Sequence, residues 1–213
     1  MRLIHFISLS LLGLNRAATL ALGKTISPPD VDITNDGLIL PDTPDGTFRL
    51  TIHSPTHMTL TILSLYLDQT ADISISTHQK RDLYLPISNA TCTGNDLLAN
   101  EYTNASAAMG HKCDDGIVIQ RRWVLFSRRG NSVAYGCSRG GPNPCSSDEF
   151  QSFNEYLDAK CGTWMTGWVY MKAWKKTYGR AVRGERICGK HPDTVGAEWL
   201  RDEEALKNRI NWP

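Results

Sequence analysis

Residues 117–137 of the chain read IVIQRRWVLFSRRGNSVAYGC, residues 144–162 read PCSSDEFQSFNEYLDAKCG, and residues 166–180 read TGWVYMKAWKKTYGR. The first piece has β-branched and aromatic residues on both sides of the turn signal 127–131, which predicts a β-hairpin. The second piece has the periodicity of a helix, and residues 167–174 of the third alternate as a strand does. These pieces predict a hairpin, a helix and a further strand in succession.

The helix is predicted from its ends as well as its face. Residues 146–149, SSDE, fit a capping box in which a serine accepts from the N3 amide and Glu149 reaches back. Gly162 is placed to end the helix in the C′ position. The apolar residues follow at spacings of three and four, at Phe150, Phe153, Leu157 and Cys161.

The strand over 167–174 divides its side chains between two faces. We expect the smaller set, Val169, Met171 and Ala173, to face the helix layer. The opposite face of the sheet would then carry an aromatic and basic set, Trp168, Tyr170, Lys172 and Trp174. This set is either an open binding surface or a second core layer, covered by the C-terminal helix or by the 24–81 segment.

Upstream, Leu83, Leu85 and Ile87 predict a short strand, and residues 93–109 predict a helix that Gly110 ends. From 82 to 174 the order is therefore strand, helix, strand, strand, helix, strand. That order is typical of an α+β, ferredoxin-like (split βαβ) domain, an antiparallel sheet with two helices on one face.

The termini divide the rest of the chain. Residues 1–23 combine a basic start, an apolar run too short to span a bilayer and small residues, which predicts a signal peptide. Residues 24–81 lack cysteine and predict a small β-rich segment, which is either a hairpin packed on the domain or a pro-segment removed after the dibasic pair Lys80-Arg81. The disulfide-stapled domain would span 82–190, and 191–213 form a helical tail. No later stretch is apolar enough to predict a membrane helix.

Six cysteines in an exported chain predict three disulfides and an extracellular location. The predicted topology places Cys92 and Cys161 at the same end of the domain, so we expect them to be bonded. Pairing of the other four, Cys113, Cys137, Cys145 and Cys188, stays open. Asn89 and Asn104 begin N-glycosylation sequons. The cysteine spacing does not suggest a metal site, and no cofactor motif is present.

Charge is informative only locally. The whole chain has a net charge of +1, which argues against a dedicated nucleic-acid binder, but residues 121–190 hold 13 lysines and arginines against five acidic residues. A basic surface is one interpretation and an ordinary solvated face is the other. The basic residues expected to flank the aromatic face are Arg121, Lys175 and Lys176, within a larger set of Arg122, Arg128, Arg129, Arg180, Arg183 and Arg186.

The cysteines and the residues around them resemble those of a known group of proteins. The run from Val133 to Cys137, the cysteines at 145, 161 and 188, and the segments Gly167-Trp168 and Tyr178-Gly179-Arg180 resemble small secreted cysteine-rich proteins of filamentous fungi, many of them candidate effectors. The element order is also similar, at the level of fold alone, to α/β killer toxins. The resemblance carries no catalytic residues with it.

These observations predict a secreted effector-like protein that binds a host or competitor surface component and has no chemistry of its own. The expected partner is a surface protein, a glycan or an anionic lipid headgroup. One alternative is a killer-type or antimicrobial toxin that acts on a membrane or cell wall. Another is a small extracellular hydrolase or ribonuclease, which would use His111 or His191 with Asp114, Asp115 or Glu155. The sequence gives no indication of oligomeric state.

Overall fold

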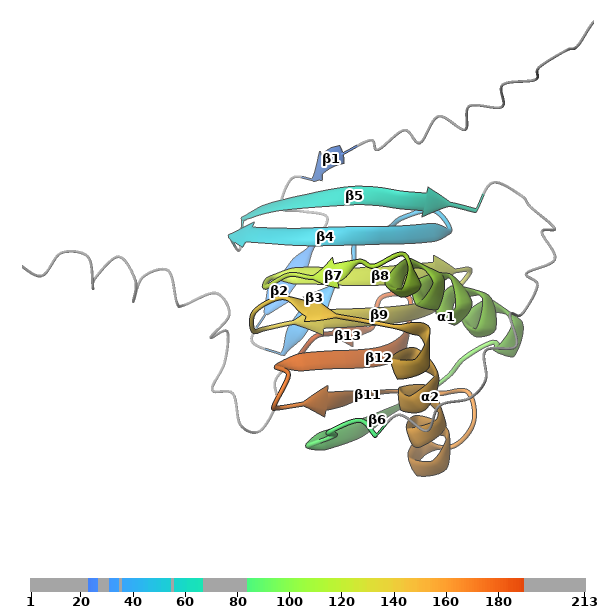
Figure 1. The fold of residues 1–213 in the computed structure, drawn as a ribbon. Helices are drawn as coiled ribbons and strands as arrows, with labels where there is room; N and C mark the ends of the chain where they lie inside the picture. Colours follow the sequence, from blue (N-terminus) through green and yellow to red (C-terminus); the bar gives the residue numbers. More distant parts are fainter. Residues whose placement is uncertain (1–22, 27–30, 35, 55, 67–83, 190–213) are drawn as a thin grey trace, which may run out of the picture.

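The protein is described here by a computed structural model, which describes residues 23–26, 31–34, 36–54, 56–66 and 84–189. It is an α+β fold in which one antiparallel sheet carries two helices on one face (Figure 1). The sheet has eight strands in the order β1-β5-β4-β8-β9-β12-β11-β6. Strand β1 (Gly23–Ile26) lies at one edge, and the other seven form the continuous central part of the molecule.

The predicted hairpin is confirmed. Strands β8 (Trp123–Arg129) and β9 (Ser132–Ser138) pair antiparallel around the two-residue turn at Gly130 and Asn131. The run of strand-forming residues before the turn is interrupted at Arg122, which has a positive φ of 65°. Its first part, β7 (Val118–Ile119), leaves the sheet and pairs instead with β10 (Asn143–Pro144).

The helix α2 (Ser147–Cys161) lies where the sequence predicts it. The Ser146 hydroxyl accepts from the backbone N–H of Glu149 at 3.2 Å, and Gly162 follows the helix with a φ of 101°. Phe150, Phe153 and Leu157 are buried as expected. The other half of the capping box is absent, because the Glu149 carboxylate binds Lys176 and Tyr178 across the layer.

The region before the hairpin differs from the prediction. The strand there is β6 (Asn89–Asp96), not residues 83–87, and helix α1 (Ala99–Asp114) begins six residues later than expected and continues past Gly110. Gly110 is buried where α1 meets α2, and a Cβ there would lie 3.2 Å from the Ser147 Cβ. Close packing of two helices therefore explains this glycine better than a helix end does.

The sheet order is not that of a split βαβ domain. Strand β11 (Met165–Met171) turns at 172–175 into β12 (Lys176–Val182), which pairs with β9 over seven residues. Because β12 occupies the place beside β9, strand β6 lies outside β11 at the edge. The sequence does not reveal β12, because the lysine and arginine within it make a buried strand look like an exposed segment. The finer ferredoxin-like prediction is wrong, while the antiparallel sheet with two helices on one face is confirmed.

The N-terminal strands belong to the same sheet as the hairpin. Strand β4 (Gly46–Ser54) pairs with β8 on one side and with β5 (His57–Leu65) on the other. Phe48 stacks on Phe126 of β8 with ring centroids 5.2 Å apart. Residues 46–65 thus extend the sheet by edge pairing and do not form a separate layer.

Two hydrophobic cores lie on opposite faces of this sheet. The helix-side core gathers residues of α1 and α2 against Leu125, Val169, Met171 and Tyr178. The opposite core contains Phe48, Leu50, Phe126 and Tyr135 and also takes in Leu38 and Ile187. The last two belong to a small sheet of β13 (Arg186–Ile187), β3 (Gly37–Ile39) and β2 (Asp32–Thr34), which lies behind the main sheet in Figure 1.

Three disulfides connect these parts. The predicted Cys92–Cys161 bond is confirmed and ties β6 to the end of α2. Of the pairings left open, the structure has Cys113–Cys145, which joins α1 to the start of α2, and Cys137–Cys188, which joins β9 to the segment after β13. Three disulfides indicate folding in an oxidising compartment.

Several predictions lie outside the described residues. They are the signal peptide at 1–23 apart from its last residue Gly23, the dibasic pair Lys80-Arg81, His191, and the helical tail at 191–213. None of the described helices is long and apolar enough to cross a membrane.

Candidate functional site

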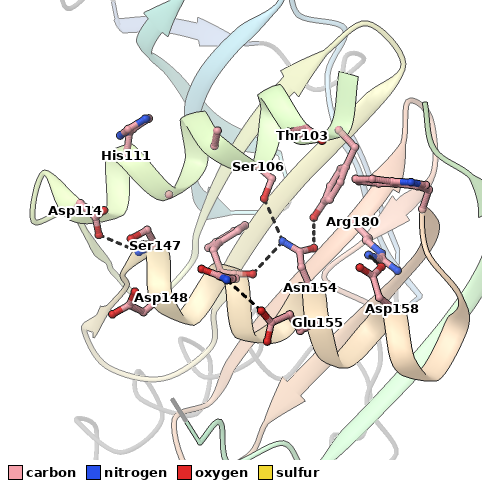
Figure 2. A pocket seen from close by; sticks show the side chains of 16 residues that line it. Thr103, Ser106, His111, Asp114, Ser147, Asp148, Asn154, Glu155, Asp158 and Arg180 are labelled. Atoms are coloured by element: carbon pink, nitrogen blue, oxygen red, sulfur yellow. Dashed lines mark hydrogen bonds and ion pairs between the residues drawn. The ribbon is translucent and has the colours of Figure 1, made fainter. Parts of the chain in front are cut away.

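A groove of about 400 Å³ runs between α1 and α2 on the outer side of the helix layer (Figure 2). The two helices are antiparallel across it, since Tyr102 near the start of α1 meets Asn154 and Asp114 at its end meets Ser147. From Thr103 to Asp114 the α1 wall is about 16 Å long at 1.5 Å per residue. Sites of this volume accommodate small molecules or short segments of polymers.

The middle of the groove is fixed by one amide. Asn154 accepts from the Tyr102 hydroxyl at 2.6 Å and donates to the Ser106 hydroxyl at 3.1 Å and to the Phe150 carbonyl at 2.9 Å. Figure 2 shows the first two of these bonds crossing from α2 to α1. Burial raises the pKa of the Tyr102 hydroxyl well above its ordinary value, so this donor keeps its proton. The amide therefore holds the two walls at a constant separation.

One end of the groove has a buried cation beneath it. The Arg180 side chain of β12 is 1% exposed and donates to Asp158 of α2 at 2.6 Å. Its other donors reach the carbonyls of Gly162 at 3.0 Å and Met165 at 2.5 Å. All these partners belong to the protein, so the guanidinium acts as a brace that holds the end of α2 to the sheet.

An indole stands at the same end. Trp164 contacts the Tyr102 ring edge to face, with centroids 6.4 Å apart, and the Arg180 guanidinium lies 6.0 Å from that same ring. Trp164 is 37% exposed and has a positive φ of 63°. A bulky residue in this conformation costs on the order of 1 kcal/mol relative to glycine. The backbone here would favour glycine, so the indole has no advantage in forming the turn itself.

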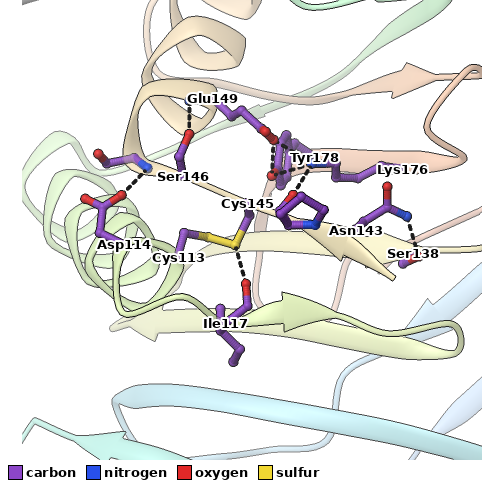
Figure 3. A network of polar contacts seen from close by, with 12 residues as sticks. Cys113, Asp114, Ile117, Ser138, Asn143, Cys145, Ser146, Glu149, Lys176 and Tyr178 are labelled. Atoms are coloured by element: carbon purple, nitrogen blue, oxygen red, sulfur yellow. Dashed lines mark hydrogen bonds and ion pairs between the residues drawn. A yellow bond between two sulfur atoms is a disulfide. The ribbon is translucent and has the colours of Figure 1, made fainter. Parts of the chain in front are cut away.

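The other end of the groove is anchored by a cap and a disulfide. The Asp114 carboxylate accepts from the Ser147 N–H at 2.9 Å, beside the Cys113–Cys145 bond (Figure 3). Asp114 is exposed, and Asp148 of the first turn of α2 also lines the groove here. Both helix ends are therefore fixed, and carboxylates remain at the surface.

A buried polar network lies just beneath this end (Figure 3). Lys176 of β12 donates to Glu149 at 2.5 Å and to the Pro144 carbonyl at 2.6 Å, and the Tyr178 hydroxyl donates to the same Glu149 oxygen at 2.6 Å. Burial lowers the pKa of Lys176, against the opposing effect of Glu149, and burial together with the Glu149 charge raises the pKa of Tyr178. This network fastens the start of α2 to the sheet, as Arg180 fastens its end.

The aromatic residues predicted to share one face divide between β11 and the turn after it. Trp168 packs against the core opposite the helices, and Tyr170 is 4% exposed. Trp174 lies in the turn after β11 and packs against the helix-side core, with the Lys176 ammonium 4.9 Å from its ring. The period-two assignment holds within β11, where Val169 and Met171 face the helices, but it fails beyond Met171 because the strand has ended.

The predicted basic flank is partly buried and partly neutralised. Lys172 and Lys175 are exposed in the 172–175 turn and Arg121 is exposed in the break before β8, but Lys176 is buried. Other members of the larger basic set pair with acidic residues, as Arg128–Asp42, Arg129–Asp45, Arg183–Asp42 and Arg186–Asp32 do. The excess of basic residues in 121–190 therefore does not form one continuous anion-binding surface.

Sequence reasoning misses the groove because its features come from separate segments. A helical-wheel reading of 147–161 does leave Asp148, Glu155 and Asp158 off the apolar face, and that was the available signal. The placement of Trp164 and Arg180 depends on β12 being inside the sheet. The sequon asparagines Asn89, on β6, and Asn104, on α1, are both partly exposed.

Among the described side chains, no group of three or more His, Cys, Asp or Glu residues is arranged to hold a metal. Comparison of the chain with family models, curated proteins and solved structures returns no significant match. The resemblance to fungal cysteine-rich proteins accordingly stays a prediction.

Proposed function

We propose that this chain is an exported binding protein without catalytic chemistry, and that the groove between α1 and α2 is its recognition site. The observation that carries the proposal is the groove itself, a rigid 400 Å³ depression whose two walls are joined by the Asn154 bonds. A site that is already formed loses little conformational entropy when a ligand binds. Its partner is a component of a foreign cell surface, and the three disulfides suit work outside the cell.

The acidic groups of the groove support binding more than catalysis. Asp114 accepts from the Ser147 amide, Glu155 from Gln151 at 3.1 Å, and Asp158 from Arg180. Each of these three carboxylates has a structural partner in its own chain. A catalytic pair instead requires neighbouring groups whose environments drive their protonation states apart.

The proposal is tested by filling the groove. Ala107 of α1 lines it, whereas Ala159 of α2 is exposed and does not line it. Ala107→Trp and Ala159→Trp introduce the same side chain on the same helix layer, so the second is a matched control. Binding of labelled protein is measured on arrays of peptides and oligosaccharides and on anionic liposomes.

The wild-type protein and Ala159→Trp should bind a common ligand, and a folded Ala107→Trp should not. Binding that survives in Ala107→Trp would move the site elsewhere, and binding to liposomes alone would favour the toxin alternative. A complete lack of wild-type binding would contradict the proposal.

A hydrolase is the second candidate, because His111, Asp114 and Glu155 line the same groove. A hydrolase would turn over RNA or polysaccharide, and His111→Ala would abolish that turnover. Ligand binding without turnover, in the wild-type protein and in His111→Ala, would support the non-catalytic proposal.

A further inference from the structure

The groove is lined mainly by acidic residues, whereas a site for anionic lipid headgroups would be basic. Four carboxylates line it, those of Asp114, Asp148, Glu155 and Asp158, against the single guanidinium of Arg180. With His111 neutral, the lining has a net charge of −3. Arg180 is buried and pairs with Asp158, so these two charges largely cancel, and the net charge of −3 comes from Asp114, Asp148 and Glu155. The groove therefore repels anionic headgroups and attracts cations.

Charge alone does not define a site, but an aromatic surface accompanies it. Trp164 is exposed at the Asp158 end and is retained in a backbone conformation that favours glycine. An indole beside a carboxylate suits a guanidinium, which stacks on the ring while its N–H groups pair with the carboxylate. Tyr102 holds the indole from the side, with the ring planes at 68°.

The carboxylates are spaced along the groove. Asp158 lies at the Trp164 end and Asp148 ten residues away on α2, which is about 15 Å along the helix axis. An extended peptide advances about 3.4 Å per residue and directs residues i and i+4 to the same side. Two arginines four positions apart would therefore reach both ends, with Glu155 between them.

We infer that the groove binds an extended basic segment of a partner protein, with two arginine or lysine side chains four positions apart. The first side chain stacks on Trp164 and pairs with Asp158. The second pairs with Asp148 and Asp114. This inference rests on the proposed function, to which it adds the chemical class of the partner.

The test uses a capped pentapeptide with arginine at its first and fifth positions. The control peptide has citrulline at both, which keeps the shape and removes the charge. Each exposed ion pair or cation–π contact contributes a few-fold to affinity, so the citrulline peptide should bind about tenfold more weakly to the full chain. Raising NaCl from about 0.05 M to about 0.5 M should weaken binding of the arginine peptide and leave binding of the citrulline peptide nearly unchanged.

Two variants locate the contact. Glu155→Gln keeps the oxygen that accepts from Gln151 and removes one charge, and we expect about two- to fivefold weaker binding. Asp36→Asn removes an exposed charge in the turn between β2 and β3, on the side of the main sheet opposite the helices, and should have no effect. Trp164→Gly should weaken binding severalfold without lowering the melting temperature, because glycine suits the local φ.

The outcomes separate this inference from the proposed function. Equal affinity for arginine and citrulline peptides, or equal effects of Glu155→Gln and Asp36→Asn, would overturn the inference. If a neutral oligosaccharide or a glucosamine oligomer binds in place of the peptides and Ala107→Trp blocks it, the groove is the site and the basic-segment inference is wrong. If the arginine peptide binds Ala107→Trp as well as wild type, both the inference and the groove proposal fail.

Discussion

The two faces of the central sheet are built by opposite means. The helix-side face contains charged side chains that cross the layer, Lys176 to Glu149 and Arg180 to Asp158. The other face is apolar, with Phe48 stacked on Phe126, and a small sheet and the Cys137–Cys188 bond cover it. An aromatic residue on the apolar face is thus part of a core, whereas an aromatic residue at the edge of the helix layer is available to a ligand.

The largest loss of stability is expected when the N-terminal strands that extend the sheet are removed. A chain that begins at Asp82 lacks seven buried side chains of the apolar core, those of Val31, Leu38, Phe48, Leu50, Ile52, Met58 and Leu60. Each contributes about 2 kcal/mol by burial, so the loss of about 14 kcal/mol is comparable to the whole stability of a typical domain. We expect no cooperative thermal transition by near-ultraviolet circular dichroism.

The same reasoning makes a prediction about processing at Lys80-Arg81. If the folded chain is cut there, the two fragments should co-elute in gel filtration and separate only in denaturant, because β4 pairs with β8 and no disulfide crosses the cut. A folded domain starting at Asp82 would restore the pro-segment interpretation and open the apolar face.

Alkaline pH should destabilise both faces. Burial raises the pKa of Tyr102 and Tyr178 on the helix side and of Tyr135 on the apolar side above the ordinary tyrosine value near 10. Above that pH the unfolded state loses protons that the folded state keeps, so stability is fully present below about pH 10 and falls as pH rises. At about pH 11 each tyrosine costs about 1.4 kcal/mol, or about 4 kcal/mol together.

The lowered pKa of Lys176 acts in the opposite direction, since its burial penalty disappears once the unfolded lysine is also neutral. Tyr135, on the other face, reports the tyrosine effect without this offset. Urea unfolding of Tyr135→Phe at neutral and alkaline pH should show about 1.4 kcal/mol less pH dependence than wild type. An identical pH dependence in the two proteins would contradict the account.

Breaking the cross-layer pair should affect only the helix side. Glu149→Ala leaves Lys176 buried without its counter-ion and should lower the free energy of unfolding by about 3 kcal/mol. The double variant Glu149→Leu/Lys176→Met replaces the pair with apolar side chains of similar size and should recover part of that loss, the remainder being the cost of leaving the buried Tyr178 hydroxyl without its Glu149 acceptor. If the double variant is no more stable than the single one in chemical denaturation, the interaction of Lys176 with Glu149 does not explain why this lysine is buried.

The smallest effects are expected from substitutions of two tryptophans, Trp168 and Trp164. Trp168 packs partly buried on the apolar core, so Trp168→Ala should cost about 2 kcal/mol of stability and leave ligand binding intact. Trp164→Gly should show the reverse, with unchanged stability and weaker binding. Loss of binding in a folded Trp168→Ala would return the site to the sheet face.

Only the locally determined parts of the fold could be predicted from the sequence. The hairpin, α2 and the Cys92–Cys161 bond were predictable because periodicity, turn residues and capping act locally. Strand β12 was not, since Lys176 and Arg180 are buried only through carboxylates on α2 that lie more than 20 positions away. Without β12 the sheet order cannot be derived, and the order decides which aromatic residues are covered.

The same limit applies to the surface around Trp168, for which the sequence left both an open face and a covered one possible. Alternation correctly put Trp168 on the face opposite Val169, but it could not show that the small sheet of β2, β3 and β13 packs on that side. The groove needs both helices and the turn at Trp164 in their final positions. A run of acidic residues on one helix indicates only a solvated surface until the second wall is known.

The most direct test of the groove is a map of where the ligand binds. Amide chemical shifts of the isotopically labelled protein can be followed by NMR while the arginine pentapeptide is added. The account predicts progressive shifts along the facing parts of α1 and α2, from Thr103 to Asp114 and from Ser147 to Asp158, and at Trp164, with β4 and β8 unchanged. Shifts confined to the 172–175 turn, Arg121 and the sheet face around Trp168 would contradict it and place recognition on the other side of the molecule.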